Sequence, residues 1–169
     1  MWHFLPPYAT YAQDYAMALD RFDKGILAEL QRDGRISNVE LAGRVSLSES
    51  ACLRRVRSLE QAGLIERYVA VLNQKKAGLA GNVFVHIALH REEQSELAAF
   101  EAAVQNLPEV MECYLMTGEF DYLLRVVVSD MADFERVHNE SLTRLPGVAR
   151  VNSSVAIRTV RKNTELPIP

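Results

Sequence analysis

The sequence contains few of the residues that mark disulfide-rich, metal-finger or membrane proteins. Its 169 residues include two cysteines, 8 glycines and 6 prolines. The cysteines, Cys52 and Cys113, lie far apart and outside any CxxC motif, so we expect neither a disulfide scaffold nor a zinc finger. This cysteine usage fits a reducing cytoplasm best. No apolar run approaches the length that a bilayer requires, so we expect no membrane association.

The charges are unevenly distributed along the chain. The whole sequence has a net charge of -3, which disfavours a nucleic-acid binder. Residues 17–79, however, hold 11 basic against 8 acidic side chains, whereas residues 80–169 hold 8 against 13. A mildly basic module followed by an acidic one is therefore expected, and DNA contact needs only a local basic face.

The first 16 residues, MWHFLPPYATYAQDYA, lack the basic start and the uninterrupted apolar stretch of a secretory signal. We expect them to form a loose extension. Met17 directly precedes the first strongly patterned segment, which makes it a plausible alternative start.

A helix is predicted in the segment after Met17. Apolar residues from Leu19 to Leu30 recur at the three-and-four spacing of one helix face. Asp20 is suited to cap its start, and Gly34 to end it.

Two more helices are predicted after this one. Ser37 and Glu40 have the spacing of a capping box, in which each side chain bonds a free backbone N–H. A third helix is expected to start at a Ser48 cap, after a turn of about three residues, and to end at Gly63.

A helix, a tight turn and a second helix make up the helix-turn-helix motif, whose second helix lies in the major groove of DNA. Arginine side chains bind guanine edges and phosphates through paired hydrogen bonds. On composition alone, three arginines on one helix are more often a solvated surface, but the tri-helical spacing favours DNA binding. The predicted DNA-contacting residues are Ser37, Ser48, Glu49, Ser50, Ala51, Arg54, Arg55 and Arg57.

The second half of the chain repeats one pattern. A strand at 83–89, a helix ending at Pro108 and a strand at 110–117 are followed by a strand at 122–128, a helix ending at Pro146 and a strand at 148–160. The result is a ferredoxin-like βαββαβ sandwich with helices on one face of a four-stranded antiparallel sheet. The strands are apolar on both sides, which predicts that two subunits pack sheet to sheet as a dimer.

The segment Thr117–Tyr122 lies between the middle strands of this sandwich. Gly118 permits a backbone turn whose free N–H groups could receive a carboxylate, and Asp121 could accept from an ammonium group. This pair would suit an α-amino acid. By itself, a hairpin turn in which Asp121 caps its own backbone is the more common arrangement.

The expected organisation has five parts, in the class α+β. They are a loose extension (1–16), a helix-turn-helix domain (17–64), an extended linker (65–81), an effector-binding and oligomerisation domain (82–161) and a C-terminal tail (162–169).

Three stretches carry a resemblance to a known family: RDGRISNVELAGRVSLSESACLRRVRSLEQAGLIERYVAVLN, ECYLMTGEFDYLLRV and LTRLPGV. They resemble the leucine-responsive regulatory protein/AsnC (Lrp/AsnC) family of transcription regulators, over about residues 19–161. The ending KNTELPIP is also similar to a branch that controls amino-acid catabolism.

The resemblance implies a winged-helix DNA-binding domain and a C-terminal domain that binds a small amino acid non-covalently, with no other cofactor. It implies dimers that assemble further, commonly into octamers, with the effector between dimers. The effector residues that it implies are Leu115, Thr117, Gly118 and Asp121, with Ser154, Val155 and Ala156 of the last strand facing them. Ser154–Ala156 departs from the family's aromatic-Val-Val pattern, and Ser48–Ala51 from its Ser-Pro-Thr-Pro run, so neither the amino acid nor the operator can be inferred.

Two alternatives to an amino-acid-responsive regulator stay open: a DNA-wrapping nucleoid protein without effector, and an enzyme or regulatory subunit built on the sandwich. The second has little support. His86 and His90 would lie roughly 13 Å apart in a strand, too far for one metal ion. His138 has no evident nucleophile partner, and the sequence has neither a Gly-rich phosphate loop nor an HExxH motif.

Overall fold

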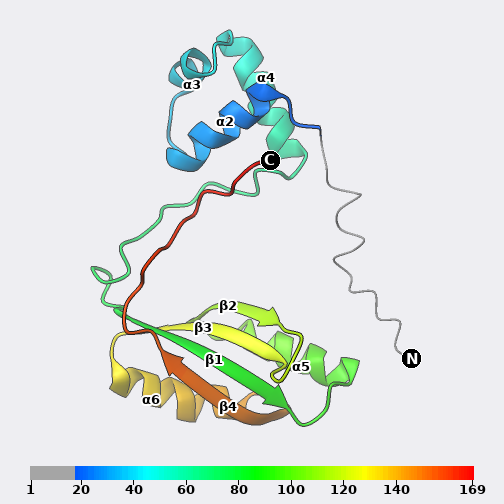
Figure 1. The fold of residues 1–169 in the computed structure, drawn as a ribbon, viewed down its shortest axis with the longest axis vertical. Helices are drawn as coiled ribbons and strands as arrows, with labels where there is room; N and C mark the ends of the chain where they lie inside the picture. Colours follow the sequence, from blue (N-terminus) through cyan, green and yellow to red (C-terminus); the bar gives the residue numbers. More distant parts are fainter. Residues whose placement is uncertain (1–17) are drawn as a thin grey trace. The chain divides into compact units, whose positions relative to one another are not determined.

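The computed structural model describes residues 18–169, which form two units. One unit combines the chain up to Ala70 with residues 161–169, and the other spans Val71–Val160. Figure 1 shows the helices of the first unit and the sheet and helices of the second. The predicted extension at 1–16 and the alternative start at Met17 lie outside the described residues.

Three helices form the first unit: α2 (Arg21–Arg32), α3 (Asn38–Arg44) and α4 (Glu49–Gln61). Their apolar faces meet in a core that excludes water, which is the main stabilising contribution for so small a unit. The buried residues of this core are Ile26, Leu27, Leu41, Ala42, Cys52 and Leu59. No helix within residues 18–169 is both long enough and apolar enough to cross a bilayer.

The predicted caps of α2 are half right. Asp20 caps its start and forms a full capping box with Asp23. At its other end the helix stops just before Gly34, as predicted, but Asp33 is the C-cap and Gly34 does not have the positive φ of a glycine cap. The Asp33 carboxylate accepts from the Arg35 N–H at 2.9 Å, an Asx turn that redirects the chain one residue earlier.

Gly34 has a different use. A Cβ at this position would lie 3.3 Å from Cδ1 of Tyr68, so glycine lets the start of the linker approach the helical unit. The Tyr68 hydroxyl donates to Glu60 at 3.0 Å. Burial, assisted by this bond, raises the pKa of Tyr68 to about 12. The chain bends at residues 64 and 65, and residues 66–73 form neither helix nor strand.

The second unit has the predicted βαββαβ order: β1 (Gly81–Leu89), α5 (Gln94–Val104), β2 (Val110–Leu115), β3 (Tyr122–Val128), α6 (Met131–Glu140) and β4 (Val148–Val155). All neighbouring strands are antiparallel, in the order β2-β3-β1-β4. This is the ferredoxin-like arrangement, so the predicted α+β class is confirmed.

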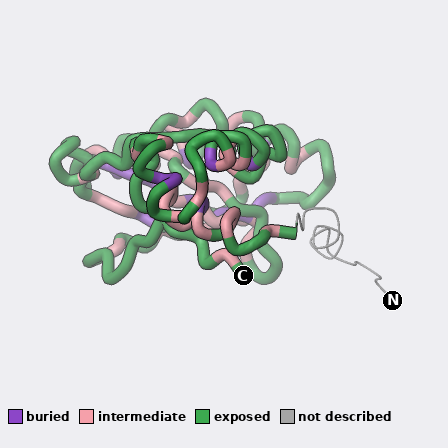
Figure 2. Tube along the Cα trace, turned by 90° about the horizontal axis from the view of Figure 1, so that it is seen from above, coloured by how far each residue is buried: buried purple, intermediate pink, exposed green. Residues whose placement is uncertain are grey.

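Side chains alternate across the sheet. In β1 the residues Val83, Val85 and Ile87 are buried, and together with alternate residues of β3 they pack against Phe100 of α5 and Val137 of α6. In Figure 2 the buried positions form short runs separated by exposed chain. Neither α5 nor α6 covers the opposite face of the sheet, which carries Phe84 with 37% of its surface exposed.

Four elements of this unit were predicted too long. The first helix ends at Val104 rather than at Pro108, and the strand predicted at 110–117 ends at Leu115. The helix expected to run to Pro146 breaks after Glu140, where the Thr143 hydroxyl bonds the Asn139 carbonyl, and a 3₁₀ turn (Leu142–Arg144) follows. The last strand ends at Val155 rather than at residue 160, because its only neighbour, β1, begins at Gly81.

Candidate functional site

The turn between α3 and α4 is built by backbone geometry. After α3, Ser46 adopts a positive φ of 58°, a position usually taken by glycine. The N–H groups of Ser46 and Leu47 then bond the carbonyls of Gly43 and Ala42. This closed C-terminal motif reverses the chain within three residues and fixes where α4 begins.

Two of the three serines predicted to contact DNA, Ser37 and Ser48, are helix caps. The Ser37 hydroxyl accepts from the Glu40 N–H at 3.2 Å, and the Ser48 hydroxyl accepts from the Ala51 N–H at 3.3 Å. The reciprocal half of the predicted Ser37 capping box is absent among residues 18–169, because the Glu40 carboxylate instead accepts from Arg44 at 2.6 Å. Both serines are exposed, and each cap positions the N-terminus of its helix.

The three arginines of α4 differ in environment. Arg55 bonds Asp20 and Asp23 of the α2 start at 2.8 Å each, and its side chain is 28% exposed. The hydrogen bond to Asp23 raises the pKa of its guanidinium. Arg54 and Arg57 are exposed and form no ion pair with any residue of the described part of the chain.

One residue of the exposed α4 face, Leu53, was not among the residues predicted to contact DNA. Leu53 is 39% exposed and lies one helical turn before Arg57. Glu49 and Ser50 are exposed on the same helix, whereas Ala51 is half-buried. An exposed leucine beside arginines on a helix could have been found from its position off the core stripe.

A polar contact holds the two helices of the motif together. The Asn38 side-chain amide donates to the Glu49 carbonyl at 2.9 Å, which joins the start of α3 to the start of α4. Arg44, at the end of α3, bonds Glu29 of α2 at 2.6 Å. That hydrogen bond lowers the pKa of Glu29 and adds to the rigidity of the surface.

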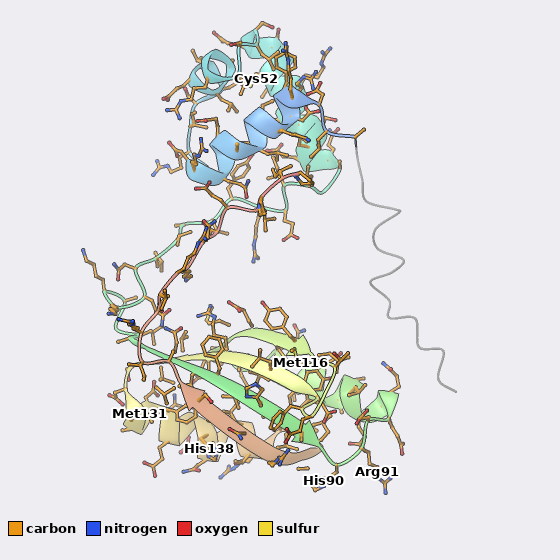
Figure 3. All side chains as sticks on the ribbon, viewed as in Figure 1. Cys52, His90, Arg91, Met116, Met131 and His138 are labelled. Carbon is orange, nitrogen blue, oxygen red and sulfur yellow. The ribbon has the colours of Figure 1, made fainter. Side chains whose placement is uncertain are left out.

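The predicted effector turn lies between β2 and β3. Gly118 has a φ of 125°, which strongly favours glycine, and Thr117 beside it is exposed. Met116 precedes them in the same loop (Figure 3). The Asp121 carboxylate accepts from the Leu89 N–H at 2.7 Å through Oδ2, so one of its two oxygens braces the end of β1.

The other predicted effector residues lie at the opposite end of the sheet. Val155 pairs with Val83 at the start of β1, whereas Tyr122, next to Asp121, pairs with Ile87 near its end. Four residues of strand separate the two positions by about 13 Å. Within one chain the turn and the Ser154–Ala156 segment therefore do not form one site.

Leu115 also borders a hollow beside the edge strand β2. This hollow has a volume of about 410 Å³ and lies between β2 and α5, with Cys113 and Glu101 in its wall. Burial raises the pKa of the Cys113 thiol to about 11, so this cysteine is neutral near pH 7.

Within residues 18–169, no three histidine, cysteine or acidic side chains converge as metal ligands would. His90 follows β1 and His138 lies on α6, whereas Cys52 is inside the helical unit (Figure 3). His86 instead packs at a tilt against Phe120, with ring centroids 5.0 Å apart.

Two family models match the chain. The first, described as winged helix-turn-helix DNA-binding, covers residues 19–66, and the second, described as Lrp/AsnC ligand binding domain, covers residues 82–166. The two matches fall on the helical unit and on the sheet unit.

Among curated proteins, the leucine-responsive regulatory proteins of Salmonella typhimurium and Escherichia coli are each 47% identical to this chain over 150 residues. Each alignment covers 89% of this chain and 92% of the relative. Among solved structures, a transcriptional regulator of Neisseria meningitidis in complex with L-Met aligns with a TM-score of 0.84 at 38% identity, over 88% of this chain and 96% of that chain. An AsnC family regulator of Agrobacterium tumefaciens aligns with a TM-score of 0.84 at 37% identity, over 88% and 97%.

Proposed function

Because the chain belongs to the Lrp/AsnC family of DNA-binding transcription regulators, we propose that it reads DNA with α4 and responds to a small amino acid held between subunits. It is a regulator and not an enzyme. The finer assignments below concern which residues contact DNA, where the effector binds and how the subunits assemble.

The DNA contacts come from the exposed face of α4. Arg54 and Arg57 project from it without a protein partner among the described residues, so both are available to phosphates or guanine edges. Leu53, beside Arg57 on the same face, suits contact with a thymine methyl group. Arg55 has a different role, because its charge is already paired with two aspartates of α2. It positions α4 instead of contacting DNA.

Ser37 and Ser48 support the same interface from the helix ends. A helix N-terminus attracts phosphate through its free N–H groups and its dipole. The caps at Ser37 and Ser48 direct two such ends, and the Asn38 bond to Glu49 keeps them together.

The effector binds where the Thr117–Asp121 turn of one subunit meets the Ser154–Ala156 segment of another. Two observations support this assignment. The turn and the Ser154–Ala156 segment are too far apart within one chain to form one site, and the Asp121 carboxylate lies in the turn. Its Oδ2 is used by the Leu89 N–H, while Oδ1 has no hydrogen-bond donor within residues 18–169 and suits an α-ammonium group. The L-Met in the Neisseria meningitidis relative favours an amino acid as the ligand.

Assembly follows from the open face of the sheet. Phe84 is exposed there beside the half-buried His86 and Leu123, and its cross-strand neighbours are Arg125 and Ser154, which leaves a mixed apolar and polar surface that a second copy can cover. Two copies packed sheet to sheet make a dimer, and dimers assembled further, as octamers, would form the shared effector sites. Both cysteines are free thiols, which is consistent with work in a reducing cytoplasm.

The test is calorimetric titration of the protein with a panel of amino acids, paired with DNA titration in their presence and absence. Asp121→Ala should weaken amino-acid binding at least tenfold and leave effector-free DNA binding nearly unchanged. The matched control is Asp130→Ala, which removes the cap of α6 in the same unit and costs about 1 kcal/mol without touching the site.

Three outcomes would count against the proposal. Equal loss of amino-acid binding in both variants would mean that Asp121 acts only through stability. Loss of DNA binding together with amino-acid binding in Asp121→Ala would contradict separate sites. No binding of any amino acid, with steep salt dependence and little sequence preference, would favour the nucleoid protein instead.

A further inference from the structure

The last nine residues of the chain belong to the DNA-binding unit although the sheet unit precedes them in the sequence. The chain leaves the helical unit after Ala70, forms the whole sheet unit, and rejoins the helices at Arg161. In Figure 1 this final segment ends beside the helices, at the mark for the C-terminus. The helical unit is therefore made of two separate chain segments.

This tail has its own local structure. The Asn163 side chain accepts from the Glu165 N–H and donates to the Glu165 carbonyl, both at 3.2 Å. Pro167 and Pro169 flank Ile168, so the backbone there is restricted to extended conformations. Little conformational entropy remains to be lost when such a segment docks.

The tail contacts helix α2 through three kinds of interaction. The Gln31 side chain accepts from the Leu166 N–H at 2.6 Å and donates to the Leu166 carbonyl at 3.3 Å. Glu165 lies 3.8 Å from Arg32. Ile168 packs against the buried core of the helical unit, and it is half-buried while its neighbours in the tail are exposed.

These contacts lie away from α4, the helix proposed to contact DNA. Gln31 and Arg32 are the last two residues of α2, and no described tail residue bonds α4. The docked tail thus leaves Arg54 and Arg57 free for DNA. A tail that covered the exposed face of α4 would inhibit DNA binding. A tail docked on the end of α2 leaves that face open and restrains only the movement of the helical unit.

We propose that residues 165–169 form a C-terminal clasp that ties α2 to the end of β4, so that two chain segments instead of one hold each helical unit. Residues 156–164 separate the end of β4 from the docked segment. A second tether narrows the range of orientations of the helical unit. In an assembly it brings two helical units closer to the arrangement that a paired DNA site requires.

The inference rests on the proposed function in one respect, which is that two helical units of an assembly bind DNA together. The clasp should then raise affinity for DNA with two half-sites and leave affinity for a single half-site unchanged. A general loss of folding would instead weaken binding to both kinds of DNA, so the comparison distinguishes a restraint on the helical unit from misfolding.

The experiment compares Ile168→Ala with Ile157→Ala in the full chain. The two changes are chemically identical, but Ile157 is 100% exposed and Ile168 is packed against the helical core. We expect Ile168→Ala to lose about threefold to tenfold in affinity for paired half-sites, with single half-site affinity kept. Ile157→Ala should match the parent protein on both DNAs.

A second variant, Gln31→Ala, removes the two bonds to Leu166 and leaves the apolar core intact. Hydrogen exchange at the Leu166 N–H should be slow in the parent protein and about tenfold faster in Gln31→Ala.

Fast exchange of this amide in the parent protein would overturn the clasp, as would unchanged paired-site affinity in both clasp variants. If the parent protein itself gains nothing from a second half-site, the proposed assembly on DNA is wrong, and so is the restraint derived from it. The exchange measurement would still decide the contact independently.

Discussion

The helical unit and the sheet unit differ in how complete their sites are within one chain. In the helical unit, the caps at Ser37 and Ser48 and the Arg55 ion pairs come from residues of that unit alone. In the sheet unit, the Asp121 turn and the Ser154–Ala156 segment lie at opposite ends of β1.

This difference separates the two activities physically. A surface that is complete in one chain can bind a DNA half-site as a monomer. The proposed effector site is divided between the two ends of a sheet and requires another copy, so we expect ligand binding and assembly to be thermodynamically linked. The predictions below test this contrast.

The largest effect is expected from a charge on the open sheet face. Phe84→Glu places carboxylates against each other wherever two such faces pack, and should convert the assembly to monomers. Light scattering after size exclusion measures this. Amino-acid binding should disappear with the assembly, while single half-site binding persists. Ile157→Glu, at a fully exposed position, should leave the assembly intact; unchanged size for Phe84→Glu would contradict sheet-to-sheet packing.

Next in size is the contrast between neighbouring arginines of α4. Arg54→Ala should weaken DNA binding by about 1–3 kcal/mol and leave the melting temperature unchanged. Arg55→Ala should lower the melting temperature, because it leaves Asp20 and Asp23 without their partner. Its affinity for DNA should stay nearly unchanged. Fluorescence anisotropy with labelled DNA and thermal unfolding measure the two. Equal DNA losses would show that Arg55 contacts DNA after all.

The fold was largely predictable because its elements are specified locally. The β-branched and aromatic run at 83–89 and the Leu-Pro pair that recurs at 107–108 and 145–146 are enough to predict the sandwich. Asp20 and Ser48 were correctly predicted as caps, since capping depends on residues within one turn.

Contacts between distant residues were not predictable in this way. The pairing of Arg55 with Asp20 depends on how two helices cross, and the docking of Ile168 depends on a tail more than 100 residues from α2. The end of β4 at Val155 depends on where β1 begins. A local sequence pattern does not specify which residues far apart in the chain come into contact.

A smaller effect is expected from acid. The backbone hydrogen bond from Asp23, aided by the Arg55 pairing, lowers the pKa of the Asp20 carboxyl from its ordinary 3.8. Its stabilising contribution is therefore present above pH 3.8 and is lost as the pH falls through the lowered pKa. Thermal unfolding of the parent protein and Asp20→Asn, measured from pH 7 to pH 2, should differ most above pH 4 and converge in acid. A constant difference at all pH values would exclude this linkage.

The smallest effect concerns the turn of the motif. Ser46→Gly relieves a positive φ in a residue with a side chain and should raise stability by about 0.5–1 kcal/mol. Gly63→Ala is the mirror test at the end of α4, where φ is 73° with no atom within 4 Å of the new Cβ, and should lower stability by about 1 kcal/mol. Denaturant unfolding measures both, and the same sign for both would contradict the strain argument.

Subunit mixing tests the shared effector site most directly. Asp121→Ala removes the carboxylate from one half of the proposed site, and Val155→Trp fills the other half. Each variant alone should assemble but fail to bind the amino acid. After the two are mixed and allowed to exchange subunits, about a quarter of the sites should combine two intact halves and recover binding, as measured by calorimetry. No recovery in mixed assemblies would contradict a site shared between subunits.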